Sequence, residues 1–255
     1  MSREDKDIIR ESFIGQEDGH IYFFYRPHLT EVRSAEDIEN LYIVLHPLAS
    51  KTLRLLSLDK PKLPLSGEHF NMITGEVVKV DDKPQGIVHE LDERKKFVHG
   101  VPEQQNPKAR ACGEGIYTLI AKEKQIHLLY VLELPSGESQ ITTQLGIDNK
   151  GDFLFGVYNP YYGTDPEDPE PQVSPVYPEY LQKPMENQRI THTQIHRLLD
   201  YEQTRFALFR EETEAGSGKI LHPLKETAKS ADIFSDLQLR VRDFPVKPLI
   251  EGKWL

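Results

Sequence analysis

Residues 116–135, IYTLIAKEKQIHLLYVLELP, decide the fold class of this chain. Two runs, 116–121 and 126–135, are rich in aromatic, β-branched and leucine residues, and the polar residues 122–125 separate them. Two such runs joined by a short polar connection predict a β-hairpin. Along the second run, alternate side chains face opposite sides, so His127 shares a face with Glu133. The hairpin indicates a protein built on antiparallel sheet.

Similar runs occur along most of the chain. Strands are predicted at residues 20–26, 41–46, 52–58, 69–80, 152–160 and 204–211, several of them ending at a proline. The stretch 69–80 is either one bent strand or two short ones. Helical segments are predicted near residues 88–96, 138–145 and 222–240, and residues 100–115 read as a loop. We therefore expect an α+β protein, mostly antiparallel sheet with a few short to moderate helices.

The domain organisation has two interpretations. One is a β-rich lobe over residues 1–110 and a second β-rich lobe over residues 111–255; the other is a single domain over residues 15–255. The segments IYFFYRP to LYIVLHP and LYVLELP to DFLFGVYNP both read as strand, short helical turn and strand. This similarity has two interpretations, an internal duplication or a chance likeness of aromatic strands. A nucleotide-binding βαβ alternation is missing, because the strands are too closely spaced.

Composition excludes several classes of function. The 255 residues include 31 basic and 41 acidic side chains, a formal net charge of −10. Such a charge argues against binding to nucleic acid and to anionic membranes, since both need a basic surface. The only cysteine, Cys112, suits a reducing compartment. The chain has no secretory signal and no apolar run long enough to span a membrane. We expect a soluble, cytoplasmic, acidic protein.

Three motif-like features have ordinary structural interpretations. His192, His196 and Asp200 have the spacing of metal ligands on one helical face, yet solvated loop histidines explain them better. Cys112 lies near two basic residues, but a small residue at the start of a strand is the simpler interpretation. The stretch 216–219, GSGK, lacks the other positions of a phosphate loop. We therefore predict no metal and no cofactor.

Residues 160–178 differ in composition from the rest of the chain. They contain six prolines, and four acidic residues lie between Thr164 and Pro171. This composition is typical of an extended acidic loop or linker. Such a loop is suited to contact with a protein partner.

Several segments together resemble a family of uncharacterised proteins of bacteria and fungi with no established function. The segments are GHIYFFYRP, AEDIENLYIVLHP, ARACGEGIYTL, HLLYVLELP, GDFLFGVYNP, VYPEYL and LLDYEQTRFALF, over roughly residues 19–210. The resemblance places a set of polar side chains on motif positions. The polar residues that it favours as ligand-binding candidates are Arg26, Arg110, Glu114 and His127, followed by Asp200 and Glu202.

The sequence leaves three functions open, and whether the protein is an enzyme is uncertain. The first is a binding or interaction protein without a catalytic motif, whose partner contacts residues 160–178. The second is a small-molecule-binding protein or enzyme, in which Arg26 and Arg110 grip an anionic ligand and Glu114 and His127 act as acid and base. The third is a subunit of a larger assembly. The second requires these four residues to converge in one pocket.

Overall fold

The computed structural model describes residues 14–28, 30–65, 72–98, 101–122, 125–162, 175–185, 187–210, 230–240 and 244–255. Its long strands are β1 (Ile14–Pro27), β2 (Ile38–Pro47), β3 (Leu53–Leu58), β4 (Met72–Asp81), β7 (Arg110–Lys122), β8 (Gln125–Leu134), β9 (Lys150–Tyr158) and β11 (Arg205–Arg210). Shorter strands are β5 (Arg94–Val98), β6 (Val101–Asn106) and β10 (Ile190–Thr191).

The helices in the described part of the chain are short. They are η1 (Ala35–Asp37), α2 (Pro84–Leu91), α3 (Gln140–Gln144), α4 (Glu179–Gln182), η2 (Lys183–Met185), α5 (Ile195–Leu198), α8 (Ile233–Asp236) and α9 (Lys247–Glu251). None of these helices is long and apolar enough to cross a membrane.

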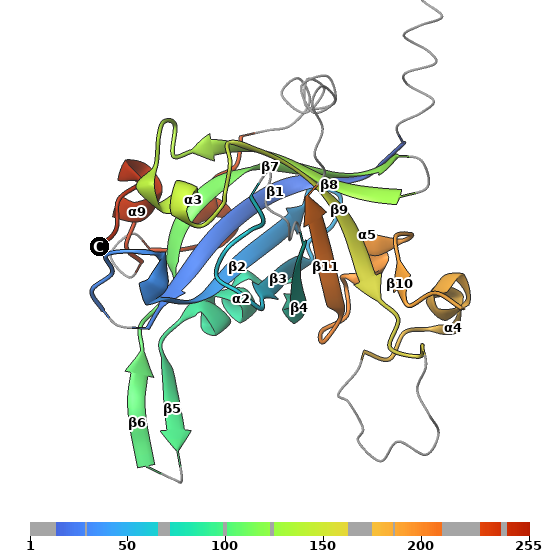
Figure 1. Cartoon of the computed structure of the whole chain (residues 1–255), viewed down its shortest axis with the longest axis horizontal. Coiled ribbons are helices and arrows are strands. Elements are labelled where there is room, and N and C mark those ends of the chain that lie inside the picture. The colour runs from blue at the N-terminus through green and yellow to red at the C-terminus, as the bar shows by residue number, and fades with distance from the viewer. Residues whose placement is uncertain are drawn as a thin grey trace, which may run out of the picture.

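Eight strands form a closed antiparallel barrel (Figure 1). Around the barrel the order is β1, β2, β3, β4, β11, β9, β8 and β7, and β7 pairs with β1 to complete the ring. Strand β10 extends the sheet beyond β9, and β5 and β6 form a separate hairpin that projects from one end. Closure leaves each of the eight strands with two neighbours, so its backbone groups are paired on both sides.

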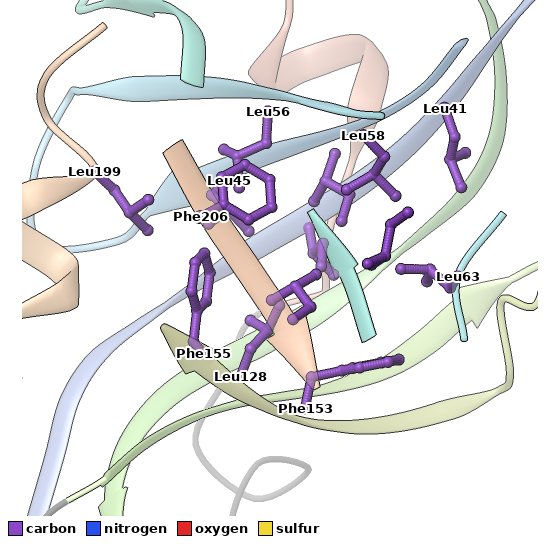
Figure 2. Close-up of a cluster of buried hydrophobic side chains, with 14 of the residues drawn as sticks. Leu41, Leu45, Leu56, Leu58, Leu63, Leu128, Phe153, Phe155, Leu199 and Phe206 are labelled. Atoms are coloured by element: carbon purple, nitrogen blue, oxygen red, sulfur yellow. The ribbon is translucent and has the colours of Figure 1, made fainter. Parts of the chain in front are cut away.

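Side-chain alternation divides the core into two parts. Ile21, Phe23 and Tyr25 of β1 belong to a buried cluster that draws residues from all eight strands, which is therefore the barrel interior. Figure 2 shows leucine and phenylalanine side chains from several strands pointing into this interior. Tyr22 and Phe24 point the other way, into a second cluster on the outer wall.

The outer wall over β1, β2 and β3 is covered by chain segments distant in sequence. Ile87 and Leu91 of α2 pack there, together with residues from the segment 230–240, which we call the strap. Leu249 of α9 belongs to the same cluster. This covering explains why β1 is apolar on both faces: one face lines the barrel and the other lies under the strap.

The structure confirms a mostly antiparallel sheet with few short helices, and it is more specific, because the sheet closes into a barrel. The strands before residue 110 and those after it join in this one sheet at two places, where β1 pairs with β7 and β4 pairs with β11. The two similar strand–turn–strand segments are both antiparallel hairpins, β1 with β2 and β8 with β9. Aligned on their prolines, Tyr22 faces outward and Tyr130 inward.

Several boundaries differ from the predictions. The helix expected near residues 88–96 lies earlier, as α2, which begins at Pro84 because proline suits the first helical turn. It ends at Leu91, and residues 94–96 belong to strand β5, so this part of the prediction is wrong. The loop expected over residues 100–115 contains β6 and the first half of β7. Of the helix expected over residues 222–240, only residues 230–240 are described, and α8 covers four of them. Residues 163–174 of the acidic stretch and the GSGK stretch at 216–219 lie outside the described residues.

Candidate metal centre

Two histidines stand side by side on the outer wall of the barrel. His20 of β1 and His46 of β2 are directly opposite each other in the antiparallel register. Such a pair brings the two side chains within contact distance, and their rings lie 6.1 Å apart in an edge arrangement. The neighbouring Gly19 allows a close approach, because a Cβ atom there would meet the His46 carbonyl oxygen and the Tyr117 ring at about 2.5 Å.

The third member of the group comes from the strap. Asp232 caps α8 by accepting from the amides of Phe234 and Ser235, and Asp236 is the last residue of this helix. Asp236 Oδ2 lies 2.5 Å from His20 Nδ1 and 3.2 Å from His46 Nδ1. The Tyr22 hydroxyl donates to the same oxygen. We call His20, Tyr22, His46 and Asp236 the outer cluster.

The arrangement has the donor set of a metal site. One ligand atom from each of His20, His46 and Asp236 lies within 4.8 Å of the others, and no other such group occurs among the described residues. Imidazole nitrogen and carboxylate oxygen both bind Zn²⁺ at about 2.0–2.2 Å, so ligand atoms around a tetrahedral ion stand about 3.4 Å apart. The spacing of 3.2 Å between His46 and Asp236 matches this value, and a small rotation of Asp236 would widen its contact with His20.

The His46 nitrogen is a second sign of an incomplete site. Its Nδ1 atom is shielded from solvent and has no hydrogen-bond partner, although it lies 3.2 Å from Asp236 Oδ2. The side chains of His46 and Asp236 keep 21% and 19% of their surface exposed, while His20 keeps 7%. An ion could therefore reach the group from solvent, and it would satisfy the buried nitrogen.

The surroundings of the cluster are negatively charged. Glu114 lies opposite Tyr22 in the register of β1 and β7, and its Oε2 accepts from the amide of Ile233, the first residue of α8. Glu133 accepts from the amide of Ala231. Burial raises the pKa of Glu114, and the charges of Asp232, Glu133 and Asp236 raise it further. Four carboxylates thus gather around α8, and their repulsion favours a bound cation.

Asp236 is nevertheless ionised. Burial acts to raise its pKa, but the contacts from His20, His46 and Tyr22 outweigh burial and hold the pKa well below its ordinary value. Burial also raises the pKa of Tyr22 well above its ordinary value, and the hydrogen bond to Asp236 adds to the increase. A charged carboxylate is the form that binds a metal ion.

A different polar group closes one end of the barrel interior. Arg54 of β3 donates from Nη1 and Nη2 to the two carboxylate oxygens of Glu17, at 2.7 and 2.9 Å. Its Nε donates to Asp200 and its Nη2 to the His196 carbonyl, both at 2.8 Å. The Tyr117 hydroxyl donates to Glu17 at 2.6 Å. We call Glu17, Arg54, Tyr117 and Asp200 the inner cluster; every guanidinium nitrogen in it has a partner, which is typical of a structural site.

The two predicted anion-gripping arginines bind the backbone. Arg26 is buried and donates to the carbonyls of Glu90, Asp92 and Pro107, at 2.7–2.8 Å. Arg110 donates to the carbonyls of Thr30 and Leu255. Both guanidinium groups therefore fix loops and strand ends.

The other candidates lie in separate surroundings. His127 pairs with Asp152 of the neighbouring strand at 2.9 Å, and both side chains are buried. Asp200 belongs to the inner cluster, and Glu202 pairs with Lys79 at 2.9 Å. Glu114 alone lies beside the outer cluster. Each of the six candidates has its own set of partners, and no hydrogen bond in the described part of the chain joins two of them.

The remaining sequence features are placed as follows. Cys112 is fully buried in the barrel interior, and burial raises the pKa of its thiol well above the ordinary value. His192 contacts the Phe155 carbonyl at 3.0 Å, whereas His196 lies on α5, where burial lowers its pKa. Asp200 binds Arg54. Among the described residues, His192, His196 and Asp200 therefore do not form a metal-ligating group.

Sequence reasoning missed the ligands of the outer cluster. His20 and His46 are separated by 26 positions and match no metal-binding motif, and Asp236 is distant from both. One signal was present: pairing the two predicted strands 20–26 and 41–46 as a hairpin brings their outer ends, and so the two histidines, together. No comparable signal places Asp236, because a long stretch of chain separates the strap from β1.

Comparison with known proteins adds no relative: no family model, no curated protein and no solved structure matches this chain.

Proposed function

We propose that this protein binds a divalent transition-metal ion through His20, His46 and Asp236. The observation that carries the proposal is the convergence of both Nδ1 atoms on one carboxylate of the strap. The unpartnered Nδ1 atom of His46 and the surrounding carboxylates support it.

The donor set favours Zn²⁺ and its neighbours in the first transition row over Ca²⁺ and Mg²⁺. Imidazole suits zinc, copper, nickel and iron, whereas calcium and magnesium take oxygen ligands almost exclusively. Three protein ligands leave at least one coordination position for water or a further ligand, as in zinc sites that perform chemistry. Tyr22 contacts Asp236 and acts as a positioning residue for this ligand.

The test is metal titration of the full chain after removal of metals with a chelator. Isothermal titration calorimetry with ZnCl₂ is expected to give one ion per chain, and Co²⁺ is expected to give visible absorption bands of a low-coordinate site. His46→Ala removes a ligand from a partly exposed position. We expect it to weaken Zn²⁺ binding by at least about 100-fold, since even losing a group that only orients a ligand costs 10–100-fold.

The matched control is His28→Ala, which removes an exposed histidine on the segment after β1. It should bind Zn²⁺ as the unaltered chain does. The proposal is wrong if the unaltered chain binds no Zn²⁺, or if His46→Ala and His28→Ala bind it equally well.

A second candidate function is the docking of a protein partner near residues 160–178. The observation that favours it is a group of exposed apolar side chains: Tyr161, Tyr162 and Tyr180 expose 43%, 50% and 57% of their surface, and Val176 exposes 83%. Tyrosine is enriched in protein interfaces. The acidic composition of residues 164–171 would favour a basic partner.

Native mass spectrometry of the protein isolated gently from its source tests both candidates together. A metal adduct would support the first, and a co-purifying basic chain the second. Replacing Tyr161, Tyr162 and Tyr180 with serine should then remove that chain and leave the metal bound. If the triple variant retains the partner, the docking candidate is wrong.

A further inference from the structure

The strap is fastened to the barrel by few polar contacts. Its residues Ile233 and Leu237 are buried against the outer wall. Its backbone amides at Ala231 and Ile233 donate to Glu133 and Glu114 of the barrel. Among its described side chains, Asp236 makes the one ionic contact with the wall, through His20 and His46.

The three ligand side chains come from both sides of this contact. His20 and His46 belong to paired strands of the barrel, whereas Asp236 belongs to the strap. An ion held by all three would therefore join the strap to the wall. If the strap moved away, the ion would keep only two histidines and would bind more weakly.

From this division of ligands we propose that metal binding controls the attachment of the strap to the outer wall. The inference rests on the proposed function, and it adds a regulatory role to the same site. Without metal, the carboxylates of Glu114, Glu133, Asp232 and Asp236 lie close together with no metal charge to offset them. With metal, the cation offsets this repulsion and ties Asp236 to β1 and β2.

Linkage gives the size of the effect. A ligand that binds only the attached state shifts the equilibrium towards it by about 100-fold when its free concentration is 100 times its Kd. The fraction of molecules with a detached strap should fall by the same factor, and the hydrogen-exchange rate of the strap amides should fall with it. The reporters are the strap amides that form hydrogen bonds: Asp236 to Asp232, Leu237 to Ile233, and Leu239 to Phe234.

Detachment would also uncover apolar side chains. The strap residues share a buried cluster with Tyr22, Tyr42 and Val44 of the barrel wall. A chain that loses metal should therefore expose an apolar surface, which a dye such as ANS detects by fluorescence.

The experiment is hydrogen exchange of the full chain with mass-spectrometric detection, with and without saturating ZnCl₂. Without Zn²⁺, amides of residues 233–239 are expected to exchange faster than those of β8 in the barrel wall, because the strap opens while the barrel stays folded. Saturating Zn²⁺ is expected to slow the exchange of these strap amides about 100-fold. ANS fluorescence should fall on adding Zn²⁺. Gln238→Ala, which removes an exposed contact with Gln85, is the control and should keep the full response; Asp236→Asn should lose it.

The outcomes separate the two proposals. If calorimetry shows one Zn²⁺ per chain but strap exchange does not change, the inference is wrong and the metal site stands. If Zn²⁺ does not bind at all, both are wrong. Strap amides that exchange as slowly as those of β8 without Zn²⁺ would also overturn the inference, because the strap would then open only when the whole barrel unfolds.

Discussion

The inner and outer clusters each take one residue from β1, Glu17 and His20, which are three positions apart. The two clusters differ in how their charges are satisfied. In the inner cluster one guanidinium meets two carboxylates, and every donor nitrogen is used. In the outer cluster several donors compete for one carboxylate oxygen, and a buried nitrogen is left without a partner. The inner cluster is closed, whereas the outer one is incomplete and partly exposed. The difference suggests that the first holds the fold and the second holds a ligand.

The largest expected effect is on the inner cluster. Arg54→Met leaves Glu17 buried without its cation, and breaking a buried pair in this way costs about 3–5 kcal/mol in the free energy of unfolding. Urea denaturation followed by circular dichroism measures it. The control is Arg205→Ala, whose ion pair with Asp59 is about half exposed and should contribute less than about 1 kcal/mol. Equal stabilities for the two variants would contradict a structural role for Arg54.

The next effect belongs to the outer cluster and appears only with metal. At a free Zn²⁺ concentration 100 times the Kd, the free energy of unfolding should rise by about 2.7 kcal/mol. The same urea experiment with and without ZnCl₂ measures the gain. His46→Ala should lose it, while Tyr117→Phe in the inner cluster should keep it. A gain that survives in His46→Ala would place the metal elsewhere.

A smaller effect on the free energy of unfolding is expected from two tyrosines that each donate to a carboxylate. Tyr117→Phe removes the hydrogen bond from the fully buried Tyr117 to Glu17 and should cost about 1.5 kcal/mol, as for other bonds to charged groups. Tyr22→Phe should cost less, because Asp236 is partly exposed and keeps its contact with His20. Thermal or urea unfolding of both variants gives the comparison. A larger loss for Tyr22→Phe would mean that the outer cluster also holds the fold.

The sequence predicted the strands better than it predicted their arrangement. Residues 20–26 and 41–46 are aromatic and β-branched, so their strands could be recognised locally. Strands β5 and β6, RKKFV and VPEQQN, are polar and include a proline, and neither was predicted. Closure depends on β11 pairing with β4 and β1 with β7, contacts between distant segments that no local pattern encodes.

The candidate site was less predictable than the fold. Arg26 and Arg110 stand on motif positions of the resemblance, where arginine predicts an anion site, but here their donors satisfy backbone carbonyls, a role that depends on which loops fold over them. Glu114 was chosen from the same motif positions and does lie beside the outer cluster. Asp236 could not be placed, since its contact with β1 arises only when the strap folds onto the barrel wall.

The smallest expected effect is a difference in the ionisation of tyrosines inside and outside the barrel. Tyr25 is fully buried, and burial raises its pKa to about 12 even though the nearby Arg110 lowers it. In the unfolded chain the same phenol ionises near pH 10, so the stability it contributes is complete below pH 10 and is lost as the pH rises through 12. At pH 11 the loss is about 1.4 kcal/mol for this residue.

Absorbance of tyrosinate near 295 nm, followed as the pH rises, measures both kinds of tyrosine in one experiment. Tyrosine side chains that are exposed to solvent should ionise in an early, reversible step. Tyr25 should ionise only in a later step that coincides with the loss of circular dichroism, since its phenolate is not tolerated in the interior. Tyr25→Phe should remove part of the late step and raise the pH at which the barrel unfolds. A single early step for all tyrosines would mean that the barrel interior admits solvent.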